Sequence, residues 1–126
     1  MIYSEPVAHA INLVAREMYQ IAADHGFHNE SSGKGHIDLV TVDRMAKFCA
    51  NLHGEVSELW EAARKGQLDK PCDKEGCDLT SAEEELADIV IRAMDTAVEL
   101  GVDLGKAILQ KAEYNSSRPY MHGKKA

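Results

Sequence analysis

Four stretches of the chain place apolar residues three or four positions apart, which is the spacing of one face of an α-helix. The stretches run from about residue 5 to 24, from 42 to 65, from 81 to 100, and from 102 or 103 to between 115 and 117. Polar loops and glycines separate them, and the alternation typical of strands is weak. We therefore expect an all-α fold resembling a four-helix bundle, with residues 1–126 forming one domain.

Residues typical of helix ends flank the second and third predicted helices. Thr41 or Asp43 is suited to cap the second helix, and Thr80 or Ser81 the third, because their side chains accept hydrogen bonds from free backbone N–H groups. Gly101 follows the third apolar stretch, where a helix commonly ends. The stripes predicted to form the core include Val7, Ile11, Val14, Met18 and Ile21 in the first helix and Trp60 in the second.

Composition narrows the class of protein. A formal net charge of −7 argues against a role that depends on covering nucleic-acid phosphates. No apolar run approaches the ~20 residues needed to span a bilayer, and the first residues lack the pattern of a signal peptide. Three cysteines, including Cys72 and Cys77 in a polar loop, are best explained as reduced thiols, so we expect a cytoplasmic protein without membrane contact.

The most informative motif is a repeated spacing of acidic residues. Glu55 and Glu58 lie three apart on the second predicted helix, and Glu85 and Asp88 lie three apart on the third. Residues three apart share a helix face, so two neighbouring helices can point four carboxylates into one space. Such a group takes up protons or binds a hard divalent cation, Mg²⁺ or Mn²⁺. Asp95 continues the same stripe two turns on, as a further ligand or a supporting group.

The plain alternative is a solvated surface. Glu-x-x-Glu is common on exposed helix faces, and we assign Glu83 and Glu84 to such a surface. A second cluster favours the metal site. Lys111 and Asn115 lie four apart on the fourth predicted helix, and Arg118 follows at its exit, although cations there also complement the helix dipole. Carboxylates for a metal together with a basic group are what a metal-bound polyphosphate requires.

These motifs resemble the MazG-like nucleotide pyrophosphohydrolase family. The family pattern is Glu-x-x-Glu, a variable gap, Glu-x-x-Asp, and then a Lys and Asn element. Residues 51–62 and 83–92 are similar to its two acidic halves, and residues 111–115 to its last element. The resemblance covers about residues 43–123 and implies an all-α hydrolase that converts nucleoside triphosphates to monophosphates and pyrophosphate.

The resemblance also implies roles for particular residues. Glu55, Glu58, Glu85 and Asp88 match the Mg²⁺ ligands, while Lys111 and Asn115, joined by Arg118, match phosphate-binding positions. Some members carry a glutamate directly after the first acidic residue to assist the attacking water, but Val56 stands there in this chain. In this chain Glu58 could instead accept the proton of the attacking water, or a metal-bound hydroxide could attack with little help.

The base pocket is weakly specified. Phe27 and His28 lie in the loop after the first helix, which contributes to the base pocket in related enzymes. For His28 a solvated loop position is the simpler interpretation, as a core position is for Trp60, although an aromatic ring stacks on any base.

Two other classes of function stay open: a nucleotide-binding regulator without chemistry, and a structural helical module that oligomerises. The four helices leave apolar surface uncovered and relatives associate, so we expect a homodimer or homotetramer.

Overall fold

The computed structural model of the chain describes residues 4–29 and 35–123, and its regular structure is entirely helical. The four α-helices are α1 (Glu5–Asp24), α2 (Val42–Arg64), α3 (Ser81–Leu100) and α4 (Leu104–Ser116). Short 3₁₀ turns occupy Ile37–Leu39 and Tyr120–Gly123, and no strand lies in the described ranges. The predicted all-α class and the helix bounds are confirmed.

Capping side chains begin α2 and α3, and a glycine ends α3. The Thr41 hydroxyl accepts a hydrogen bond from the Arg44 N–H at the start of α2. At the start of α3, the Thr80 hydroxyl accepts the Glu83 N–H while the Glu83 carboxylate accepts the Thr80 N–H. Gly101 ends α3 with a φ of 73°, a conformation that favours glycine.

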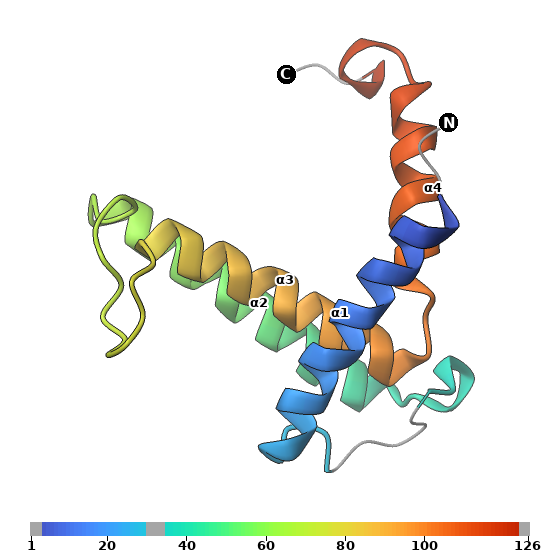
Figure 1. Cartoon of the computed structure of the whole chain (residues 1–126), viewed down its shortest axis with the longest axis horizontal. Coiled ribbons are helices and arrows are strands. Elements are labelled where there is room, and N and C mark those ends of the chain that lie inside the picture. Colours follow the sequence, from blue (N-terminus) through green and yellow to red (C-terminus); the bar gives the residue numbers. More distant parts are fainter. Residues whose placement is uncertain (1–3, 30–34, 124–126) are drawn as a thin grey trace.

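The helices form two units that cross. Helices α2 and α3 run antiparallel as a long hairpin, the α2–α3 arm, whose far end carries the loop of residues 65–80 (Figure 1). Helix α1 crosses the C-terminal part of α3, and α4 packs along the N-terminal part of α1 (Figure 1). Among the described residues, α4 therefore lies beside α1, so the single chain does not close the expected four-helix bundle around α2 and α3.

Small residues set the contact between α1 and α4. A Cβ added to Gly105 would lie 2.1 Å from the Ala8 carbonyl oxygen, so the two backbones touch there. The Gly105 N–H also donates to Asn12 Oδ1 at 2.8 Å. Ala8 is one of three buried alanines of α1, with Ala15 and Ala22, which recur every seventh residue and so share one face of the helix.

The predicted apolar stripe is only partly core, which is a correction. Val7, Val14 and Ile21 of α1 are about half exposed, and Trp60 of α2 is 64% exposed. The physical reason for Trp60 is that α2 has α3 as its principal packing partner, so its opposite side is left uncovered. The chain thus presents large apolar side chains that its own helices do not bury.

Within the described residues, no helix combines the length and the apolar character that crossing a membrane requires.

Candidate metal centre

Two helices of the α2–α3 arm bring the four predicted carboxylates together. Glu55 and Glu58 come from α2, and Glu85 and Asp88 from α3. One carboxylate oxygen from each lies within 4.8 Å of the other three. The three-residue spacing puts each pair on one helix face, and the antiparallel hairpin turns the two faces toward each other. Oxygen donors at this separation are suited to a hard divalent cation such as Mg²⁺.

The electrostatics of this acidic cluster favour neutralisation. Burial, a hydrogen bond with Glu58 and repulsion by neighbouring carboxylates raise the pKa of Glu85 to about 7. The pKa of Glu55 and that of Asp88 are also raised, in each case chiefly by burial and then by neighbouring negative charge. Glu55 Oε2 and Glu85 Oε2 are buried and accept no hydrogen bond from the described residues. A cation placed here would satisfy these oxygens and reverse the pKa shifts.

Two basic side chains flank the cluster and are already engaged. Arg92 Nη2 lies 3.9 Å from Glu55 Oε1, and its Nη1 lies 3.4 Å from Asp95 Oδ2. Lys74 Nζ lies 3.1 Å from Glu84 Oε1. The Glu84 side chain is only 13% exposed, so the prediction of a solvated position was wrong for Glu84. Lys74, in the loop between α2 and α3, folds back against the Glu84 carboxylate.

A cavity of about 500 Å³ opens beside the cluster. Glu58, Glu84 and Glu85 form one side, and the loop after α2 contributes Gln67, Lys70 and Asp73. It has room for a phosphate chain next to the carboxylates. The loop residues gave no sequence signal, because their approach to α3 depends on the turn of the hairpin.

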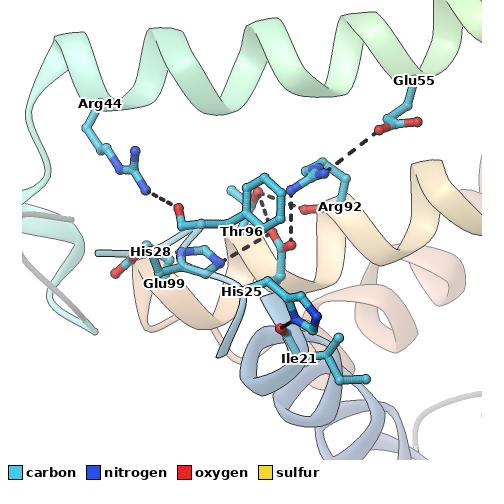
Figure 2. A network of polar contacts seen from close by, with 10 residues as sticks. Ile21, His25, His28, Arg44, Glu55, Arg92, Thr96 and Glu99 are labelled. Atoms are coloured by element: carbon cyan, nitrogen blue, oxygen red, sulfur yellow. Dashed lines mark hydrogen bonds and ion pairs between the residues drawn. The ribbon is translucent and has the colours of Figure 1, made fainter. Parts of the chain in front are cut away.

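Behind the cluster lies a buried polar network, which Figure 2 shows from close by. His28 is 3% exposed and its Nδ1 lies 2.8 Å from Glu99 Oε1, while its Nε2 lies 3.9 Å from Asp95 Oδ1. The solvated position predicted for His28 is therefore wrong, because α1 and α3 enclose the ring together with Tyr19. Glu99 was missed by the sequence analysis, since a lone glutamate near a helix end is usually exposed.

Asp95 connects this network to the metal centre. It is almost fully buried, and burial raises its pKa while Arg92 and His28 lower it. Asp95 contacts Arg92, and Arg92 in turn contacts Glu55, so Arg92 links Asp95 to one of the candidate ligands. Asp95 lies outside the group of four converging carboxylates, so of the two roles expected for it the position fits a supporting group rather than a further ligand.

The candidate base-binding residues separate in space. Phe27 is 59% exposed, and the Arg92 guanidinium carbon lies 5.5 Å from its ring centroid. Phe27 also lines a mainly apolar cavity of about 330 Å³ together with Met18, Ile21 and Ile91, and with Arg92 and Asp95 at its polar end. His28 and Trp60 do not line this cavity, so Phe27 is the one of the three candidate base-binding residues that does.

The predicted phosphate-binding residues lie elsewhere in the chain. Lys111 and Asn115 belong to α4, and Arg118 follows it. Lys111 Nζ and the Arg118 guanidinium both lie over the Tyr114 ring, 4.5 and 5.6 Å from its centroid. Helix α4 stands against α1, away from the N-terminal half of α3 that carries Glu85 and Asp88 (Figure 1). One chain therefore does not bring these residues to its own carboxylates.

Comparison of the chain with protein-family models, with curated proteins and with solved structures finds no match.

Proposed function

We propose that this protein has a MazG-like fold and hydrolyses nucleoside or deoxynucleoside triphosphates to a nucleoside monophosphate and pyrophosphate, with Mg²⁺ as cofactor and Mn²⁺ as a substitute. The observation that carries the proposal is the convergence of Glu55, Glu58, Glu85 and Asp88 within 4.8 Å. Their order in the sequence, followed by Lys111 and Asn115, supports the same activity through the family resemblance. Removal of non-standard or surplus nucleotides is a fitting role.

The four carboxylates would hold the cation at the wall of the 500 Å³ cavity. A bound Mg²⁺ supplies an acidified water and neutralises phosphate charge, which hydrolysis of a polyphosphate requires. Glu58 is exposed and lines the cavity, so its carboxylate is accessible to accept the proton of the attacking water. Val56 offers no proton acceptor, and Glu55 is held toward Arg92.

The rest of the substrate would extend from the cluster along the arm. Phe27 is positioned to stack on the base in the apolar cavity, where Arg92 and Asp95 supply polar groups. Trp60 is exposed and provides a second aromatic face. His28 is enclosed, so its contribution to the base pocket is to hold the loop that carries Phe27.

The test uses the purified full chain, a panel of nucleotides and Mg²⁺, with pyrophosphate release as the readout. Glu58→Gln should reduce turnover at least about 100-fold, because it removes both a ligand charge and the proton acceptor. Glu61→Gln is the matched control, since Glu61 lies on the same helix but pairs with Arg64 at 2.8 Å. No pyrophosphate from any nucleotide, or full activity in Glu58→Gln, would refute the proposal.

The same preparation separates the rival functions. Nucleotide that raises the melting temperature without being hydrolysed identifies a binding regulator, because a ligand of the native state stabilises it. A melting temperature indifferent to Mg²⁺ and nucleotide identifies a structural helical module.

A further inference from the structure

The cavity of about 500 Å³ beside the acidic cluster, which we call the loop-side cavity, lies on one particular side of the cluster. Along α3, Glu85 belongs both to the cluster and to this cavity, which continues to Ser81 at the start of the helix. The apolar cavity proposed for the base lies on the other side, where Ile91 and Asp95 of the same helix line it. A nucleotide that places its base there and its cleaved bond at the cluster therefore directs its last two phosphates toward the loop of residues 65–80 (Figure 1).

Four acidic side chains line the loop-side cavity, and each already has a role. Lys74 Nζ lies 3.1 Å from Glu84 Oε1 and 3.1 Å from Asp73 Oδ1, so one ammonium group serves both of these carboxylates. Glu58 and Glu85 are candidate ligands of the cation. Lys74 is therefore engaged, and two phosphates entering this cavity require another positive charge to offset their own.

The N-terminus of α3 does not supply that charge, because its first N–H groups are hydrogen-bonded within the chain. The Ser81 N–H donates to the Lys70 carbonyl at 2.8 Å, and the Ala82 N–H donates to the Leu68 carbonyl at 3.0 Å. The next N–H group donates to the threonine cap. These three groups are not open to an anion, so a side chain has to meet the phosphates.

Lys70 is the side chain that meets this requirement. Among the described residues that line the loop-side cavity, Lys70 alone carries a positive charge. Its side chain is exposed, and within the described part of the chain no hydrogen bond or ion pair engages its ammonium group. Its backbone is held in place, because the Lys70 N–H donates to the Gln67 carbonyl at 3.1 Å and its carbonyl accepts the Ser81 N–H. The loop thus fixes the backbone of a lysine whose charged end is available to a ligand.

We propose that Lys70 binds the pyrophosphate part of the nucleotide, the β- and γ-phosphates, and so determines which way the triphosphate lies across the acidic cluster. The inference rests on the proposed function, because it takes the cleaved bond to lie at the cluster. Water adds to the α-phosphorus, its proton passes to Glu58, and the bridging oxygen leaves with the β- and γ-phosphates. The Lys70 ammonium group stays paired with this leaving group as its negative charge grows. Lys70 thereby favours triphosphates over nucleotides that have no pyrophosphate group.

Binding of the two products tests this assignment without turnover. Isothermal titration calorimetry of the full chain with inorganic pyrophosphate and Mg²⁺ should give a dissociation constant at least about 10-fold higher for Lys70→Gln than for wild type, because a charge-assisted contact is lost. The dissociation constants of the common deoxynucleoside monophosphates should not change, since the monophosphate lies on the other side of the cleaved bond. Pyrophosphate that binds neither chain or binds both equally well, or a loss of affinity for both products, would overturn the assignment.

Two controls separate a contact from an effect of net charge or of folding. Lys65→Gln removes one positive charge from the same arm, but Lys65 pairs with Glu61 at 3.5 Å outside the cavity, so pyrophosphate should bind as it does to wild type. Without ligand, Lys70→Gln and Lys65→Gln should melt as the wild type does, because both lysine side chains are exposed. An equal loss of pyrophosphate affinity in Lys65→Gln would mean that net charge attracts the anion, and the assignment of Lys70 would be wrong.

Nucleotide hydrolysis separates this inference from the proposed function. In an active enzyme, Lys70→Gln should lower kcat/KM for the triphosphate about 10-fold or more. If pyrophosphate binding depends on Lys70 but wild type hydrolyses no nucleotide, the assignment of Lys70 holds and the proposed function fails. If wild type is active and Lys70→Gln keeps both its kcat/KM and its affinity for pyrophosphate, the proposed function holds and the assignment of Lys70 is wrong.

Discussion

Replacing Glu85 with glutamine should stabilise the protein without divalent cation and remove its response to Mg²⁺. The reason is the acidic cluster, where burial and neighbouring carboxylates raise the pKa of Glu85 to about 7 from its ordinary 4.5. Above that pH the folded chain must hold an ionised carboxylate in a place that disfavours it. Glutamine has a similar shape and no charge, so it relieves this repulsion.

The size of the effect follows from the two pKa values. Each pKa unit of difference between the folded and unfolded states corresponds to about 1.4 kcal/mol. If Glu85 were fully buried, its ionisation at high pH would therefore lower the free energy of unfolding by about 3 kcal/mol. The Glu85 carboxyl is partly accessible, and solvent screening reduces the expected gain in unfolding free energy to about 1.5 kcal/mol. For a chain of 126 residues this is a rise of about 6 °C in melting temperature.

The pH dependence has a defined direction. A carboxyl whose pKa is raised by folding stabilises the folded state most at low pH, and that stability is lost as the pH rises from 4.5 to about 7. The advantage of Glu85→Gln should therefore be complete at pH 8 and disappear below pH 4.5. Thermal unfolding followed by circular dichroism at fixed protein concentration, with a chelator present, measures this difference.

Added Mg²⁺ should bring the stability of the wild type up to about that of Glu85→Gln. At a Mg²⁺ concentration ten times its dissociation constant, the wild type gains about 1.4 kcal/mol, whereas Glu85→Gln has lost a ligand and gains little. Glu61→Gln should respond to Mg²⁺ as the wild type does, because Glu61 pairs with Arg64 outside the cluster. The reasoning is refuted if Glu85→Gln is no more stable than wild type at pH 8, or if Mg²⁺ stabilises both chains equally.

Three other substitutions probe the fold around the site. Gly105→Ala should lower the free energy of unfolding by about 2 kcal/mol or more in a urea titration, because its Cβ would lie 2.1 Å from the Ala8 carbonyl oxygen. Thr80→Ala removes the hydroxyl that caps α3 and should cost about 1 kcal/mol in the same assay. Arg92→Met leaves the buried Asp95 without its cation and should cost about 3 kcal/mol at pH 8, but less at pH 5, where Asp95 takes up a proton more readily.

Matched variants make these three results interpretable. Gly54→Ala, on α2 with open space around its Cβ, should be neutral or slightly stabilising. Thr80→Ser should keep the cap. Adding Asp95→Asn to Arg92→Met should recover most of the lost stability, since no buried charge is then left unpaired. Equal losses in Gly54→Ala and Gly105→Ala, a loss in Thr80→Ser, or no recovery in the double variant would contradict the respective argument.

The features that sequence alone predicted are local ones. Helix bounds followed from apolar spacing and from caps such as Thr41 and Thr80, whose hydrogen bonds reach only three residues along the chain. The grouping of Glu55 with Glu58, and of Glu85 with Asp88, follows from helical geometry in the same way. Convergence of the two pairs needed only that consecutive helices pack side by side, which is common for helices joined by a loop.

Other features depended on contacts between distant segments. His28 is buried because α1 and α3 enclose it, and its partner Glu99 lies 71 residues further along the chain. Trp60 has the spacing of a core residue, yet it is exposed because, among the described helices, α3 is the principal packing partner of α2 and leaves its opposite side uncovered. Spacing identifies an apolar face but not the element that will cover it.

The sequence by itself therefore determined four helices and the register of four carboxylates, since both depend on interactions within a few residues. The tertiary structure decided where α4 lies, because the contact of Gly105 with Ala8 joins α4 to α1 rather than to the arm. That backbone contact cannot be read from periodicity: it depends on how closely two particular helices approach.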